Sequence, residues 1–187
     1  MSTDDREETL SPKVYKKILG VLGDDYQYAT QVVTYSEVQG CEFDYMGMAE
    51  FRDALTHVKR AIFTNDESVA FDELNSASEH IRRAAVESMQ EYVEGKYASI
   101  KRRLYLNVIK REHLSELEGK IRESLIQGRS VKPFKNWKEA IGYFKEAETL
   151  LNQLDEEMPL MDIRVNRLKL LIYLLIAGIT GYLIATL

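Results

Sequence analysis

The three histidines of this chain, His57, His80 and His113, are the side chains best suited to move protons near neutral pH. At His57 the sequence adds Arg52 five positions earlier, with Asp53 next to that arginine. An imidazole can transfer a proton, and a guanidinium can hold a phosphate or stabilise its developing negative charge. Arg52 and His57 are therefore the candidate catalytic pair.

A resemblance to the R-x4-6-H signature of the HEPN ribonucleases is carried by the six residues from Arg52 to His57. The resemblance implies an all-helical bundle in which arginine and histidine side chains of a dimer cleave RNA. The alternative is a structural role, in which His57 bonds to Asp53 four positions earlier on the same helix.

Metal-binding patterns are missing from the sequence. His80 and His113 each follow a glutamate directly, and neighbouring residues on a helix point to different sides. No H-x-x-x-H spacing occurs, and Cys41 is the only cysteine. No phosphate-binding glycine loop or nucleophile elbow is found. We therefore predict no metal and no cofactor.

The sequence contains a short internal repeat, which we call the internal echo. Its two segments lie 23 positions apart, ALTHVKRA at 54–61 and ASEHIRRA at 77–84. One interpretation is a duplicated helical unit that presents His and Arg together to an anion. The favoured interpretation is structural, with Ala, Val58 and Ile81 in the core and the cations in solvent.

The charge is unevenly distributed along the chain. Residues 1–95 contain 9 Lys and Arg against 19 Asp and Glu, a net of −10, whereas residues 96–132 contain 10 against 4, a net of +6. Such a basic segment could contact anionic lipid, nucleic acid or the acidic half of another copy, or could be an ordinary solvated helix face, which we favour. Its candidate anion or partner contacts are Lys101, Arg102, Arg103, Lys110 and Arg111.

The last eighteen residues, 170–187, contain no charged side chain. A run of that length is close to the ~20 residues that cross a ~30 Å hydrocarbon layer as a helix. Arg164, Arg167 and Lys169 precede it, and such flanking cations favour the cytoplasmic side. We therefore predict a C-terminal, single-pass membrane anchor with a cytoplasmic soluble domain.

Small residues within this stretch, Ala177, Gly181 and Ala185, are spaced four apart. That spacing places them on one stripe of a helix, where a second transmembrane helix can approach closely. We predict self-association through this stripe.

The apolar spacing predicts an all-α fold, a bundle of about five to six helices followed by the transmembrane helix. Residues 1–10 are expected to be a flexible acidic N-terminus, 11–158 the bundle, and 159–187 a C-terminal helix whose anchor covers about 168–187.

Residues 26–39 fit a strand or a helix, and we favour a helix. The expected helices are 12–22, 49–63, 66–127 with an interruption at Gly95, 133–154, and one that starts at Pro159, while 40–48 form a loop. The expected core positions are Phe51, Leu55, Val58 and Ile62, then Ile100, Leu104, Val108, Leu114, Leu117, Ile121 and Leu125, and then Trp137, Ile141, Phe144, Leu151 and Leu154.

These features together favour a non-enzymatic, membrane-anchored adaptor, scaffold or membrane effector that forms oligomers. The alternative function is a membrane-tethered HEPN-like ribonuclease that uses Arg52 and His57. The expected partners are the lipid bilayer, further copies of the chain and an unidentified protein, with nucleic acid as a less favoured partner.

Overall fold

The computed structural model describes residues 10–105, 112–131 and 136–186, and the side chains within them except those of 105, 112, 158–166, 178 and 180–186. These residues form α1 (Pro12–Gly20), η1 (Val21–Asp25), α2 (Tyr26–Gly40), α3 (Tyr45–Phe63), α4 (Glu67–Tyr105), α5 (Glu112–Ser130) and α6 (Trp137–Thr186). No strand occurs in the described part of the chain. The all-α prediction is confirmed there, and residues 26–39 are helical.

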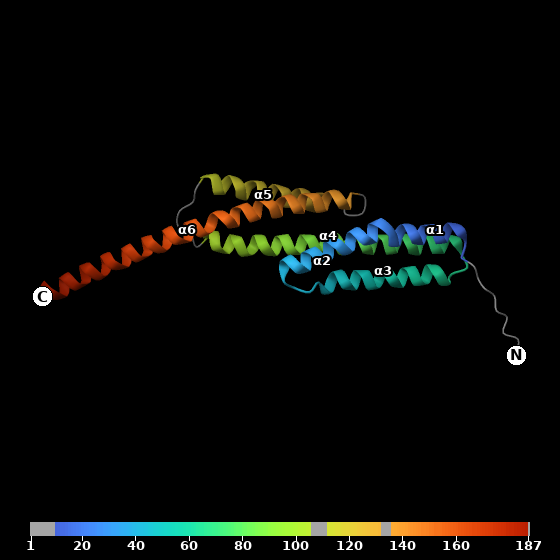
Figure 1. Cartoon of the computed structure of the whole chain (residues 1–187), viewed down its shortest axis with the longest axis horizontal. Helices are drawn as coiled ribbons and strands as arrows, with labels where there is room; N and C mark the ends of the chain where they lie inside the picture. The colour runs from blue at the N-terminus through green and yellow to red at the C-terminus, as the bar shows by residue number, and fades with distance from the viewer. Residues whose placement is uncertain (1–9, 106–111, 132–135, 187) are drawn as a thin grey trace, which may run out of the picture.

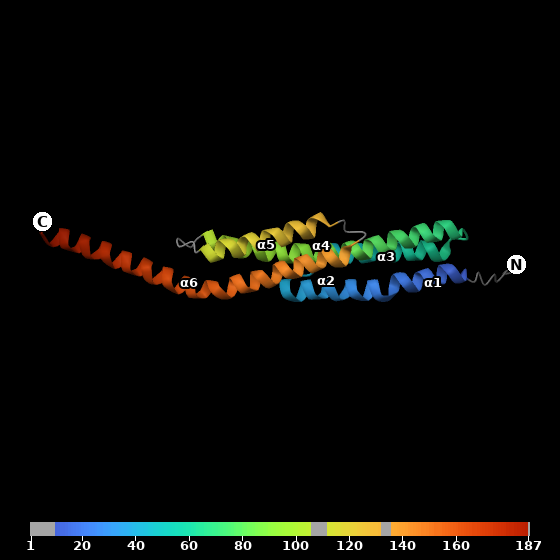
Figure 2. The same ribbon diagram turned by 90° about the horizontal axis from the view of Figure 1, so that it is seen from above.

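The helices pack into an elongated bundle with α4 at its centre (Figures 1 and 2). Helices α2, α3 and α6 pack along α4, and α5 packs along the first half of α6. The second half of α6 projects beyond one end of the bundle, and α1 lies at the opposite end (Figure 1).

One continuous core runs through the bundle. Its largest fully buried side chains are Phe144, Leu74, Ile81, Met89, Ile100, Ile121, Ile141, Leu151, Leu154 and Val93. All the predicted core positions of α6 are buried, as are the described ones of α5. The apolar spacing therefore identified the inner faces of these two helices.

The first helix, expected over 12–22, ends at Gly20, and a short π-helical turn, η1, follows it. Gly23 lies outside the helical region, at φ −84° and ψ −127°, between α1 and α2. The predicted loop at 40–48 is shorter than expected, because α3 begins at Tyr45. Asp44 starts this helix by accepting a hydrogen bond from the Gly47 backbone N–H at 2.7 Å.

The core prediction for α3 was wrong at two positions. Leu55 is 55% exposed and Ile62 is 40% exposed, whereas Phe51 and Val58 are buried as expected. The buried face is completed by small residues instead, because α3 lies very close to α4. A Cβ added at Gly47 would lie 2.9 Å from the Ser88 hydroxyl of α4. The remaining small residues on this buried face are Ala54 and Ala61.

Several predicted helix boundaries were also wrong. The predicted helix over 66–127 is two helices, α4, which ends at Tyr105, and α5, which begins at Glu112. Gly95 does not interrupt α4, because a single glycine with helical backbone angles costs a helix only ~1 kcal/mol. Pro159 does not start a helix, since α6 runs through it from Trp137 to Thr186. A proline removes one backbone hydrogen bond, and a helix this long can continue past it.

The described side chains of the C-terminal stretch are solvent-exposed from Arg167 to Ala177 and at Ile179. Within the part of the chain that the structure describes, no helix is long and apolar enough to cross a membrane.

Gly128 of α5 lies directly against the core. A Cβ added at Gly128 would lie 2.9–3.2 Å from three ring atoms of Phe144, which is fully buried. Gly119 lies on the same helix, and a Cβ added there would have no atom within 4 Å. Neither glycine has a positive φ, so alanine fits both backbones.

We therefore predict opposite effects for one substitution at two positions of α5. Gly128→Ala should lower the free energy of unfolding by about 1–3 kcal/mol, because the added methyl group overpacks against Phe144. Gly119→Ala should raise it by up to about 1 kcal/mol through helix propensity alone. Thermal unfolding followed by far-UV circular dichroism would measure both, and a stabilising Gly128→Ala would contradict the described packing.

Candidate functional site

The internal echo forms the contact between two antiparallel helices. Its alanines Ala54, Ala61, Ala77 and Ala84 are all buried between α3 and α4. The favoured structural interpretation of these alanines is therefore confirmed, as is the burial of Val58 and Ile81. Small side chains at this contact let the residues that flank it reach across to the other helix.

Two glutamates extend the echo beyond the eight residues compared in the sequence. Glu50 precedes His57 by seven positions, and Glu73 precedes His80 by seven positions. Each glutamate bonds the histidine of the other helix. The Nδ1 atom of His57 lies 2.6 Å from Glu73 Oε2, and that of His80 lies 2.6 Å from Glu50 Oε2. The repeated Glu-x6-His spacing was a signal in the sequence that our prediction missed.

The two imidazole rings contact each other between these carboxylates. Their centroids are 5.1 Å apart and their planes differ by 23°. We name Glu50, His57, Glu73 and His80 the histidine pair cluster. All four side chains are 13–23% exposed, so the cluster lies at the edge of the α3–α4 contact and reaches the surface.

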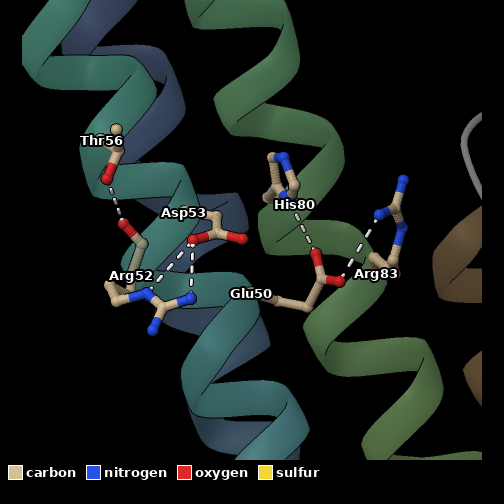
Figure 3. Close-up of polar contacts among 6 residues, drawn as sticks. All are labelled: Glu50, Arg52, Asp53, Thr56, His80 and Arg83. Atoms are coloured by element: carbon tan, nitrogen blue, oxygen red, sulfur yellow. Dashed lines mark hydrogen bonds and ion pairs between the residues drawn. The ribbon is translucent and has the colours of Figure 1, made fainter.

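Charged neighbours surround one end of the histidine pair cluster. Arg83 Nη1 lies 3.5 Å from the second carboxylate oxygen of Glu50 (Figure 3). Burial raises the pKa of Glu87, and the negative charge of Glu50 raises it further, while Arg83 opposes the shift. Asp44 and Glu91 also raise it, so Glu87 lies near several carboxylates.

The candidate catalytic pair does not come together within one chain. Arg52 points away from α4 and bonds the carboxylate of Asp53 at 3.1 and 3.2 Å, with its side chain 74% exposed (Figure 3). His57 faces α4 instead and bonds Glu73, so the predicted bond from His57 to Asp53 is replaced by a bond to another helix. Residues five apart on a helix lie about 140° apart around it, which explains the separation.

A cavity among the described residues is also unlike a phosphate site. It measures about 960 Å³ and lies beside the turn between α2 and α3, against α4. Acidic and aromatic side chains dominate its lining, and Lys96 is its single cation. The acidic and aromatic residues are Glu37, Glu42, Asp44 and Glu91 with Phe43, Tyr45 and Tyr92. Such a lining would repel an anionic substrate.

The basic segment, 96–132, covers the end of α4 and all of α5, and three of its candidate contacts, Lys101, Arg102 and Arg103, lie at the end of α4. Arg103 bonds Asp155 of α6 at 2.6 Å, and the Lys101 ammonium lies 5.6 Å from the centre of the Tyr97 ring. Arg102 is exposed. Lys110 and Arg111 lie outside the described residues.

The predicted membrane residues are described only in part. Arg167, Lys169 and Ala177 are exposed. The side chains of Arg164, Gly181 and Ala185 lie outside the described set. No group of three or more His, Cys, Asp or Glu side chains in the described structure is arranged to hold a metal ion.

A buried carboxylate connects three helices elsewhere in the bundle. Glu148 of α6 is 5% exposed and accepts hydrogen bonds from the hydroxyls of Tyr35 on α2 at 2.7 Å and Tyr92 on α4 at 2.8 Å. The Lys96 ammonium donates to the Tyr92 oxygen and to Asn152 of α6. Burial and the bonded Glu148 carboxylate raise the pKa of Tyr35 to about 12 and raise that of Tyr92 as well.

Comparisons with known proteins leave the family of this chain open. No protein-family model, no curated protein and no solved structure matches it.

The raised tyrosine pKa values predict a loss of stability in alkali. Above pH 10 these tyrosines would release protons in the unfolded chain, while Tyr35 would stay protonated in the folded chain up to about pH 12. The unfolded state then binds fewer protons, so the free energy of unfolding should fall as the pH rises from 10 to 12. Below pH 10 this contribution should be constant.

The matched variant is Tyr35→Phe/Tyr92→Phe, which removes both titrating hydroxyls. It should be less stable than the wild type at pH 8, by a few kcal/mol at most, because Glu148 loses two donors. Its stability should also fall less between pH 10 and 12, whereas Tyr15→Phe, at an exposed tyrosine, should follow the wild type. Urea unfolding at each pH would measure this, and parallel curves would exclude the proposed role of the two hydroxyls.

Proposed function

We propose that this chain is a C-terminally anchored, single-pass membrane protein whose helical bundle lies in the cytoplasm and acts as an oligomerising adaptor, scaffold or membrane effector without enzymatic activity. The bilayer and further copies of the chain are its proposed partners, and the bundle provides the surface for an unidentified protein partner.

The observation that carries this proposal is the exposure of α6 on every side. Seven consecutive large apolar residues in its projecting half are each 50–68% exposed. They are Leu170, Leu171, Ile172, Tyr173, Leu174, Leu175 and Ile176. Seven residues make two full turns, so apolar side chains occupy all faces of the helix. One partner helix would cover only one stripe, whereas lipid surrounds a helix completely.

The uncharged stretch 170–187 is long enough in the sequence to span the hydrocarbon layer of a membrane. Described side chains cover only residues 167–177 and 179 of this stretch, and the uncharged sequence continues to Leu187. Eighteen residues rise about 27 Å as a helix, close to the ~30 Å hydrocarbon thickness. Arg164, Arg167 and Lys169 at the near end support a cytoplasmic bundle.

The ribonuclease alternative has less support. Arg52 and His57 are separated within the chain, and the cavity lining is acidic. Arg103 of the basic segment is engaged by Asp155, which also weakens the case for nucleic acid binding. RNA cleavage by the purified full chain that Arg52→Ala and His57→Ala each abolish would replace the proposal with the alternative.

We expect charged substitutions in α6 to release the protein from membranes. Each Asp near the centre of a span costs about 2.5–3.5 kcal/mol, so Leu175→Asp/Ile179→Asp should abolish retention in membranes washed with alkaline carbonate. Leu55→Asp makes the same change at an exposed leucine of the bundle and should leave retention intact. A wild-type protein that washes off membranes would rule out the anchor.

We also expect the small-residue stripe to hold copies together. Gly181→Ile should weaken self-association of the detergent-extracted full chain by about tenfold or more, because the added side chain separates the helices. Ile179→Trp adds bulk about 200° away around the helix and should leave association unchanged. Sedimentation over a range of detergent-to-protein ratios would measure both variants. Monomeric wild-type protein would disprove the oligomer while leaving the anchor intact.

A further inference from the structure

The cavity beside the turn between α2 and α3 has the chemistry of a site for cations. We propose that it binds an arginine-rich segment of another protein, whose guanidinium groups contact the carboxylates and aromatic rings of the lining. This proposal rests on the adaptor role proposed above, and it names the chemistry of the protein partner. The walls of the cavity come from the end of α2, from the turn with the start of α3, and from α4.

Two carboxylates of the lining are open to a ligand. The side chains of Glu42 and Glu91 are exposed, and no described side chain forms a hydrogen bond or ion pair with either of them. Glu37 and Asp44 hold the turn itself, because Glu37 accepts the Asp44 N–H at 3.0 Å and Asp44 accepts the Gly47 N–H at 2.7 Å. The open pair can therefore bind a ligand while the other two carboxylates shape the site.

The single cation among the described lining residues does not neutralise these carboxylates. The Lys96 ammonium donates to the Tyr92 oxygen at 3.2 Å and to the Asn152 side chain at 2.5 Å, and both acceptors are uncharged. The lining contains four carboxylates against this one ammonium, so its formal charge is 1 − 4 = −3. A cationic ligand would complement that charge.

Exposed aromatic side chains lie beside the open carboxylates in the same lining. Phe43 is 56% exposed and Tyr45 is 78% exposed, and their ring centroids lie 4.9 Å apart. Met46 also belongs to the lining and is 59% exposed. Tyrosine, phenylalanine and methionine are enriched where proteins bind one another, and a guanidinium stacks on aromatic faces. Aromatic rings next to carboxylates therefore favour arginine over other cations.

The size of the cavity and the state of the basic segment indicate a segment of another protein. A volume of about 960 Å³ accommodates several side chains, whereas a single small cation would leave most of it to water. A second copy of the chain fits less well, because three arginines of its basic segment already bond carboxylates of their own chain. They are Arg103, Arg122 and Arg129.

Fluorescence anisotropy with the detergent-solubilised full chain tests the proposal. The probe is a fluorescein-labelled peptide of alternating arginine and glycine, and its matched control is a peptide of alternating glutamate and glycine. We expect the arginine peptide to bind and the glutamate peptide not to bind. The affinity should fall as the salt concentration rises, because the open carboxylates are exposed to solvent.

A pair of charge variants locates the binding. Glu42→Gln/Glu91→Gln should weaken it about fivefold or more, because two ion pairs with the peptide are lost. Glu79→Gln/Glu123→Gln changes the net charge equally at exposed carboxylates outside the lining, and it should bind as the wild type does.

A pair of aromatic variants tests the stacking. Phe43→Ala/Tyr45→Ala should weaken binding of the arginine peptide about fivefold, because the guanidinium groups lose both rings. Tyr15→Ala removes an exposed ring of α1 and should leave the affinity unchanged.

Equal affinities of the two charge variants would overturn the site, and so would a wild-type protein that does not bind the arginine peptide. Displacement of the probe by spermidine at lower concentrations than by unlabelled arginine peptide would overturn it in favour of a small organic cation. Weaker self-association of Glu42→Gln/Glu91→Gln would overturn it in favour of a second copy. These residues lie outside α6, so failed peptide binding with intact membrane retention contradicts the cavity alone, whereas wild-type protein that washes off membranes contradicts the anchor.

Discussion

The burial of α4 on most of its circumference is the constraint from which the rest of the bundle follows. Ala84, Ala85 and Val86 are consecutive and are all buried, at 0%, 0% and 6% exposure. Three consecutive helical residues point across about 200°, so no single neighbouring helix could cover them. Helices α2, α3 and α6 therefore pack around α4, and α5 is left to cover the outer side of α6.

The close contact between α3 and α4 explains why the histidine pair cluster is reciprocal. The same Glu-x6-His spacing occurs on both helices, and the helices run in opposite directions (Figure 1). Two copies of one pattern on antiparallel helices are related by a local twofold axis, so each glutamate meets the histidine of the other copy. Alanines at the contact allow this, because larger side chains would hold the helices too far apart.

The sequence predicts the helices of this chain well, but it predicts poorly which helices and side chains contact one another. Periodicity placed Phe51, Val58 and Trp137 on buried faces, because the apolar stripe is a local property of each helix. It also placed Leu55 on the buried face, because it scores apolarity and carries no information on how closely two helices approach. It also paired His57 with Asp53, whereas the structure bonds His57 to Glu73, sixteen residues away. That contact depends on which helices are neighbours, and spacing within one helix does not determine this.

The continuity of α6 links the proposed membrane half to the bundle. One helix runs from Trp137 to Thr186, and its backbone hydrogen bonds transmit rotation along its axis, although Pro159 lacks the N–H for one of them. Glu148 lies on the bundle half and accepts the hydroxyls of Tyr35 and Tyr92 from two other helices. A rotation of the projecting half would either break these two buried hydrogen bonds or move Tyr35 and Tyr92 together with Glu148. If copies assemble through the proposed membrane half, α6 connects that assembly to the packing of α2 and α4, and Pro159 lies between the two halves as the point at which the helix can bend.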